Sequence, residues 1–127
     1  MKAAAIVCGS LGAIAALTSQ LAAQSPNFNL TYHVERFPNA QVDLVECGAV
    51  VEKTAKSAGF SVNTQQFPNQ LVMVSGGEEG KGVFTAQCIA VNDVTVTVLQ
   101  GIDYRATKGE LGALADQLQR AILTISE

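Results

Sequence analysis

The segment from Gly82 to Gly101 constrains the fold most, because it is the longest β-favouring stretch of the chain and contains Cys88. It is rich in β-branched and aromatic residues, which fit the pleated, half-buried surface of a sheet. Asn92-Asp93 interrupts this run, and a turn-forming pair between two such arms is typical of a β-hairpin. We therefore predict two neighbouring antiparallel strands in this segment.

The register of this hairpin depends on the length of its loop. A two-residue turn at Asn92-Asp93 would place Cys88 opposite Thr97 and divide the apolar residues between both faces of the hairpin. A three- or five-residue loop instead gathers the apolar residues on one face: Phe84, Ala86, Cys88, Ala90, Val94, Val96 and Val98. Because a slip of one residue turns every side chain to the opposite face, burial should favour the odd-length loop, which we predict.

Residues 1–23 have the composition of a secretory signal. Lys2 is followed by an apolar run from Ala3 to Leu17 and by a short stretch that ends in the small residues Ala22 and Ala23. The run is shorter than the roughly 20 residues that a membrane-spanning helix needs. We expect cleavage after Ala23, which leaves residues 24–127 as a single periplasmic or secreted domain with no stable membrane insertion.

The charge of the chain excludes two classes of partner. The full sequence has a net charge of −3, and without Lys2 seven basic residues face eleven acidic ones, a net charge of −4. Such a surface repels nucleic acid and anionic lipid more than it attracts them. Signal cleavage would also leave two cysteines, Cys47 and Cys88, in a compartment where disulfides persist.

Residues 27–37 alternate strictly between apolar and polar side chains, as a half-buried strand does. The polar side of this strand carries Thr31, His33 and Glu35. We expect these three side chains to face outward, away from the core.

The first helix has readable ends. Asp43 followed three residues later by Glu46 is typical of a helix N-terminus, and Gly59 tolerates the backbone angles of a C-terminal stop. Apolar residues recur between these ends at helical spacing, and Cys47 is one of them.

A second helix is predicted over the last residues, where an apolar stripe runs from Leu111 to Ile125 and Thr107 with Glu110 suggests a hydroxyl cap. Two short strands over residues 60–66 and 71–75 lie between the first helix and the hairpin. The expected order is β-α-β-β-β-β-α. Short links between the middle strands favour an α+β fold with a mostly antiparallel sheet of about five strands and both helices on one face.

Cys47 and Cys88 both fall at positions that the pattern assigns to the interior. A bond between them would join the first helix to the sheet and close a loop of 41 positions, worth roughly 4 kcal/mol in the chain-entropy model. The alternative is a redox or metal pair, but the spacing is far from Cys-x-x-Cys and no histidine cluster accompanies it. We predict a structural disulfide.

The candidate functional residues are few. His33 is the one histidine, and with Glu35 it offers two metal ligands, too few for a zinc site. Tyr104 and Arg105 share a linker whose composition interfaces favour, although Tyr104 could also cover the edge of the core. The glycine-rich residues 75–82 lack P-loop spacing and contain two glutamates that repel phosphate, so we predict a mobile connection there. No metal, cofactor or catalytic set is predicted.

The whole chain after the leader, with the segment Tyr32-His33-Val34-Glu35-Arg36 and its two cysteines, resembles small exported bacterial proteins classed as domains of unknown function. The resemblance implies the bacterial periplasm and assigns no active residues. We expect a non-enzymatic module that binds a protein or a small ligand. It would use either the strand face with Thr31, His33 and Glu35, or the loops of residues 75–82 and 103–105, the second of which contains Tyr104 and Arg105. An inhibitor or immunity protein is one form of such a module. The alternative is a small hydrolase or metal-dependent enzyme that uses His33 with a carboxylate.

Overall fold

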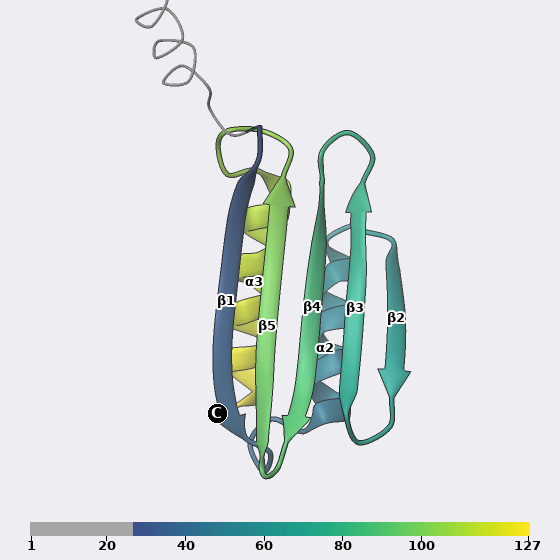
Figure 1. Ribbon diagram of the computed structural model, residues 1–127, viewed down its shortest axis with the longest axis vertical. Helices are drawn as coiled ribbons and strands as arrows, with labels where there is room; N and C mark the ends of the chain where they lie inside the picture. Colours follow the sequence, from purple (N-terminus) through teal and green to yellow (C-terminus); the bar gives the residue numbers. More distant parts are fainter. Residues whose placement is uncertain (1–26) are drawn as a thin grey trace, which may run out of the picture.

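The structure is a computed structural model that describes residues 27–127, so the predicted leader and its cleavage site lie outside the described residues (Figure 1). Five strands and two helices follow in the predicted order β-α-β-β-β-β-α. Their bounds are β1 Asn29–Pro38, α2 Leu44–Ser57, β2 Val62–Phe67, β3 Leu71–Glu78, β4 Gly82–Val91, β5 Val94–Asp103 and α3 Glu110–Ile125.

The strands form one fully antiparallel sheet in the order β1-β5-β4-β3-β2. Both helices lie on the same face of this sheet (Figure 1). Helix α3 packs on β1 and β5, and α2 packs on β3 and β4. The predicted α+β architecture is therefore confirmed, and β1 and β2 are its two edge strands.

The connection between β3 and β4 is shorter than the predicted glycine-rich loop, because β3 continues through Gly76 and Gly77 to Glu78. A Cβ atom at Gly76 would clash with the carbonyl oxygen of Ser61, and one at Gly77 with that of Gly82. These glycines therefore allow close backbone approach within the sheet, a role that glycine also takes in strands.

The predicted register of the β4–β5 hairpin is wrong. Asn92-Asp93 forms a two-residue turn, Val91 pairs with Val94, and Cys88 lies opposite Thr97. Asn92 has a φ of 55°, in the left-handed region that tight hairpin turns require. Thr97 is consequently fully buried on the helix side. The turn chemistry selected this register, and no burial penalty opposed it because both faces of the sheet accept apolar side chains.

The predicted orientation of β1 is also wrong. Thr31, His33 and Glu35 turn toward α3, whereas the side chains of Tyr32 and Val34 on the other face are 63% and 56% exposed. The reason is that the covering helix presents polar side chains to this edge strand, so the polar side of β1 is the one that matches it.

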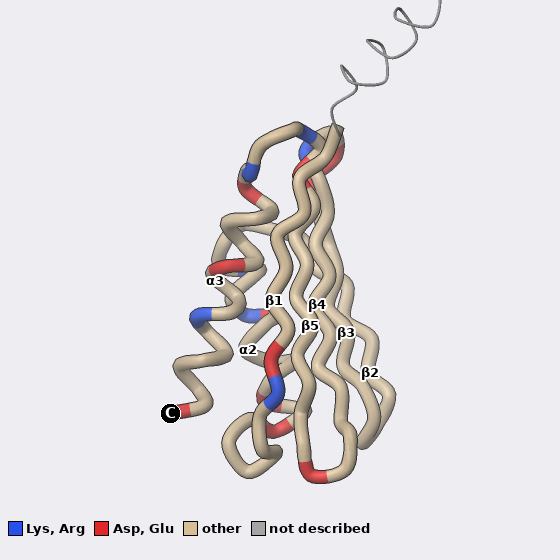
Figure 2. The backbone as a smooth tube through the Cα atoms, turned by 60° about the vertical axis from the view of Figure 1, so that its left-hand side comes forward, with Lys and Arg blue, Asp and Glu red and all other residues tan. Residues whose placement is uncertain are grey.

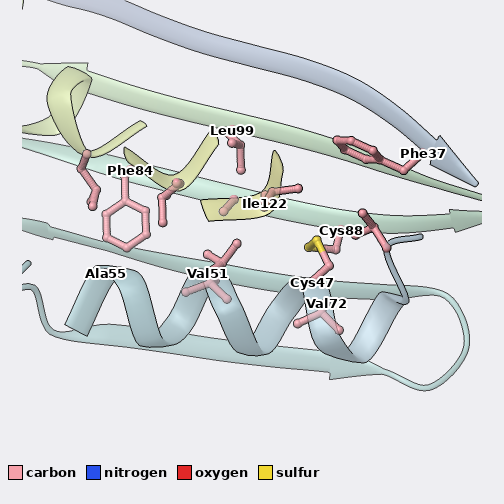
Figure 3. Packing of buried hydrophobic residues seen from close by; sticks show 14 of the residues in the cluster. Phe37, Cys47, Val51, Ala55, Val72, Phe84, Cys88, Leu99 and Ile122 are labelled. Carbon is pink, nitrogen blue, oxygen red and sulfur yellow. A yellow bond between two sulfur atoms is a disulfide. The ribbon is translucent and has the colours of Figure 1, made fainter. Parts of the chain in front are cut away.

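The disulfide between Cys47 and Cys88 is present as predicted, with a Cα–Cα distance of 6.2 Å (Figure 3). Both cysteines are at most 1% exposed. The bond ties the first turn of α2 to β4 within the apolar layer between helices and sheet. Both cysteines belong to a cluster of buried residues that also includes Phe37, Val42, Val51, Val72, Val74, Phe84, Leu99, Leu114, Leu118 and Ile122.

The first helix begins and ends as predicted. The Asp43 carboxylate accepts hydrogen bonds from the backbone N–H groups of Val45 and Glu46 at 3.0 and 3.2 Å. Gly59 has a φ of +96° just after the helix. Within residues 27–127, neither helix combines the length and apolar character needed to cross a bilayer.

Replacement of both cysteines, Cys47→Ala with Cys88→Ala, should lower the free energy of unfolding by about 4 kcal/mol, because the unfolded chain regains the entropy that the 41-residue loop removes. Urea denaturation of the parent protein and of the double variant measures the difference. Ellman's reagent on the denatured, unreduced parent should detect no free thiol at these two positions. A loss below about 1 kcal/mol would show that α2 docks through packing alone.

Candidate functional site

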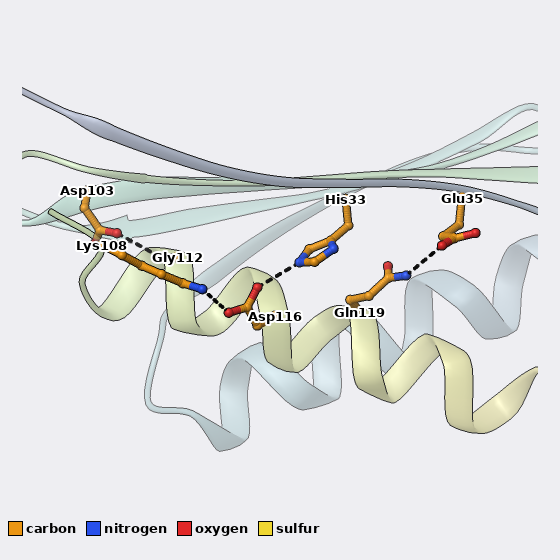
Figure 4. Close-up of polar contacts among 7 residues, drawn as sticks. All are labelled: His33, Glu35, Asp103, Lys108, Gly112, Asp116 and Gln119. Carbon is orange, nitrogen blue, oxygen red and sulfur yellow. Dashed lines mark hydrogen bonds and ion pairs between the residues drawn. The ribbon is translucent and has the colours of Figure 1, made fainter. Parts of the chain in front are cut away.

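The sequence-predicted residues Thr31, His33 and Glu35 belong to β1. The side chains of His33 and Glu35 point toward α3 (Figure 4). His33 Nε2 donates to Asp116 Oδ1 at 2.8 Å, and the second carboxylate oxygen of Asp116 accepts from the Lys108 ammonium. The hydrogen bond from Lys108, and then the one from His33, hold the pKa of Asp116 below its usual range. The Asp116 carboxylate thus accepts hydrogen bonds from both His33 and Lys108, and it orients the histidine ring.

Glu35 and Thr31 also contact α3. The Gln119 amide Nε2 donates to Glu35 Oε1 at 3.4 Å, one helical turn beyond Asp116. A Cβ atom at Gly112 would clash with Thr31 Oγ1, so the helix backbone lies close to the strand at this point. His33 and Glu35 therefore attach the edge strand to α3, and Thr31 lies against the helix backbone.

In many enzymes a carboxylate that accepts a hydrogen bond from a histidine orients that histidine as a general base, and His33 with Asp116 shows this contact. Here the side chains of His33 and Asp116 are 31% and 29% exposed, so solvent reaches the pair. Among residues 27–127, no three histidine, cysteine, aspartate or glutamate side chains gather closely enough to hold a metal ion. The 2.8 Å contact between His33 and Asp116 also fits a structural hydrogen bond that holds β1 against α3.

Asp103 is the residue that sequence reasoning missed at the start of α3. Its carboxylate is 1% exposed and accepts from the backbone N–H groups of Gly109, Leu111 and Gly112 at 2.8, 2.9 and 3.0 Å. The predicted Thr107 cap is wrong, because Gly109 occupies the N-cap without a side-chain bond. A local sequence pattern cannot reveal this cap, since Asp103 belongs to the end of β5.

Tyr104 and Arg105 lie in the loop that follows Asp103. Tyr104 is 51% exposed, and the Arg105 Nε donates to Thr107 Oγ1 at 3.1 Å. Both residues line a pocket of about 300 Å³, together with Gly80, Lys81, Asp103, Gly109 and Glu110. The structure therefore divides the predicted residues between two places, because Thr31, His33 and Glu35 do not line this pocket.

The face of the sheet opposite the helices was not identified as a candidate binding surface from the sequence. We call this surface the open face. The strand registers place the following residues on it: Leu30, Tyr32, Val34 and Arg36 of β1; Val94, Val96, Val98, Gln100 and Ile102 of β5; Val83, Thr85, Gln87, Ile89 and Val91 of β4; Leu71, Met73, Ser75 and Gly77 of β3; Asn63, Gln65 and Phe67 of β2.

The open face is nearly free of charge. Arg36 is the one charged residue among its strand positions, and the other polar groups are amides and hydroxyls. Figure 2 shows the acidic and basic residues gathered on the helices, the turns and one stretch of β1, while β3, β4 and β5 are free of them along most of their lengths. Six of the large apolar or aromatic side chains that are at least 36% exposed lie here: Leu30, Tyr32, Val34, Phe67, Val83 and Val91.

The alternation of β1 contained a signal for this surface. Leu30, Tyr32 and Val34 form an apolar side of β1, and β4 has apolar residues at both odd and even positions, such as Phe84 and Ile89. Two helices can cover only one face of such a sheet. A second apolar face was therefore implied by the composition of the strands.

Comparison with known proteins identifies a family for this chain, and that family has no assigned activity. The family described as "Family of unknown function (DUF6180)" matches residues 27–127. No curated protein matches the sequence. Among solved structures, the Mll3558 protein from Rhizobium loti is similar at 14% identity over 77% of this chain and 94% of that chain, with a TM-score of 0.35.

The substitution Asp116→Asn should reduce the loss of folding stability that occurs as the pH is lowered. Because the native pKa of Asp116 is lowered, the native state binds fewer protons than the unfolded state, in which the pKa is about 3.9. The pair therefore stabilises the fold above about pH 4, and this contribution, about 1 kcal/mol or less for a solvent-reached pair, is lost as the pH falls through the lowered native value.

Thermal unfolding followed by circular dichroism between pH 2 and 7 measures this effect. The matched control is Asp93→Asn in the β4–β5 turn, which removes a carboxylate that has no lysine, arginine or histidine partner in the described part of the chain. If Asp116→Asn and the parent lost the same stability between pH 7 and pH 2, the stabilising role of the Asp116 carboxylate would be contradicted.

Proposed function

The chain belongs to the family DUF6180, which has no assigned function, and we propose that it is a non-enzymatic binding module whose partner is another protein chain. The observation that supports this proposal is the open face, where exposed apolar side chains and neutral polar groups share one side of a five-stranded sheet. Monomeric soluble proteins rarely expose contiguous apolar patches larger than a few hundred Å², and larger ones mark interaction sites.

We also propose that this binding takes place in the bacterial periplasm or outside the cell. The leader-like composition of residues 1–23 supports export, and the buried Cys47–Cys88 disulfide suits an oxidising compartment. An inhibitor or an immunity protein against a secreted toxin is a module of this kind. Such a module needs a stable scaffold and a contact surface, and no turnover.

The loop pocket is a second place for binding. Tyr104 offers an aromatic ring, and Arg105 offers guanidinium donors at the rim of a space of about 300 Å³. That size is at the lower end of small-molecule sites. A small ligand of the module would therefore bind here, while the open face would bind a protein.

The rival proposal is a small hydrolase or metal-dependent enzyme, and the 2.8 Å contact between His33 and Asp116 is the observation that favours it. An enzyme of this kind should lose its turnover in His33→Ala while the variant keeps the parent's circular dichroism spectrum. Such a loss would refute the non-enzymatic proposal. Lys108 also donates a hydrogen bond to Asp116, and this second contact favours a structural role for His33 and Asp116 instead.

Site-specific photo-crosslinking in cells tests the proposed function. A benzophenone amino acid replaces Val34 on the open face, and the matched control replaces Val45, an equally apolar residue that is 66% exposed on α2. The full chain is expressed, the cells are irradiated, and adducts are separated on a denaturing gel. We expect an adduct of discrete mass from Val34 and none from Val45, because the partner would cover the sheet and not the helix. No adduct from Val34, or the same adducts from both positions, would contradict the proposal.

A further inference from the structure

We infer that the partner on the open face is a second copy of this chain, stacked sheet against sheet in a two-fold symmetric dimer. This inference rests on the proposed binding role of that face. The size of the face, the chemistry of its polar groups and the distribution of charge over the rest of the molecule favour this occupant.

The open face has the size of a stable interface. Five strands spaced about 4.8 Å apart, with about nine residues each at about 3.3 Å per residue, give a face of roughly 24 by 30 Å. Its projected area of about 700 Å² approaches the roughly 800 Å² that each partner buries in a standard protein interface. A copy stacked on this face would therefore bury enough surface for a stable dimer.

The polar groups of the open face are complementary to themselves. A two-fold interface brings the same patch of both copies together, so each group must be able to pair with a group of its own surface. The amides of Gln65, Gln87 and Gln100 both donate and accept hydrogen bonds, and so do the hydroxyls of Tyr32 and Thr85. Thr85 already donates to Gln100 Oε1 at 3.1 Å across the two central strands. These groups can be satisfied by an identical copy.

The distribution of charged residues favours association of two copies through the open face. Residues 27–127 contain eleven acidic and seven basic residues, so two copies repel each other over most of their surfaces. The carboxylates lie on the helices, the loops and the helix side of β1, β3 and β5, and none lies at a strand position of the open face (Figure 2). The same negative charge disfavours an anionic membrane as the occupant.

The shape of the face also suits sheet stacking. Two twisted sheets pack face to face about 10 Å apart, with side chains of both inner faces interdigitating. Val96, Val98 and Ile89 occupy the central strands, where such a core would form. The charged Arg36 belongs to the edge strand β1, so it would lie at the polar rim of the interface.

Lysine substitution on the two sides of the molecule tests this inference. Val98→Lys places a charge on central strand β5, and Val34→Lys places one on edge strand β1, where lysine is well tolerated. Val45→Lys on α2 is the matched control, because it makes the same change at an exposed valine on the helix side. The full chain is expressed in each case, and sedimentation equilibrium of the recovered protein gives its mass and its dissociation constant. Circular dichroism confirms that each variant is folded.

We expect the parent and Val45→Lys to be dimers, and both open-face variants to dissociate at least about tenfold more readily. The crosslinked adduct from Val34 should have twice the mass of the chain. A monomeric parent at about 100 µM, or a dimer that both lysines leave unchanged, would overturn the inference, since the second result indicates pairing through an edge strand or a helix.

Two further outcomes separate this inference from the proposed function. A monomeric parent that gives a Val34 adduct of another mass would refute the dimer and retain the protein-binding role. A monomeric parent that gives no adduct would refute both. Co-sedimentation of the parent with phosphatidylglycerol vesicles, lost in Val34→Lys with Val98→Lys, would assign the open face to a membrane and overturn the dimer as well.

Discussion

The attachment of α3 to the end of β5 by Asp103 is the interaction on which the arrangement of the molecule depends. A buried carboxylate that accepts three backbone N–H groups fixes the start of the helix over β5 and β1. It also stabilises the positive end of the helix dipole. Gly109 and Gly112 are part of the same arrangement, because a Cβ atom at either position would press against the Asp103 carboxylate.

The position of α3 determines what each face of β1 can do. With the helix in this position, His33 contacts Asp116 and Glu35 contacts Gln119. The polar residues that were expected to bind a partner therefore hold β1 against α3 instead. The Cys47–Cys88 bond fixes α2 beside it on the same face. Within residues 27–127 no helix covers the opposite face of the sheet, and the proposed binding role follows from that asymmetry.

The candidate site shows where inference from sequence was limited. Tyr104 and Arg105 line the loop pocket, and their binding role stays a prediction. The outward orientation expected for Thr31, His33 and Glu35 was wrong, because alternation shows that a strand has two different faces and does not show which one a helix will cover. The neutrality of the open face could be recognised only after the registers had brought residues of five strands together.

The sequence by itself determined the kinds of elements, their order, the ends of α2 and the disulfide, because periodicity, capping residues and the inward positions of two cysteines are local properties. The tertiary structure decided the strand order, the register of the β4–β5 hairpin and the direction in which β1 faces. These depend on long-range pairing and on which side chains a helix presents to the sheet. The two-residue turn at Asn92 was available from the local sequence, and only the assembled sheet showed that burial does not oppose it. The Asp103 cap required the assembled fold outright, because Asp103 belongs to another element than the helix that it caps.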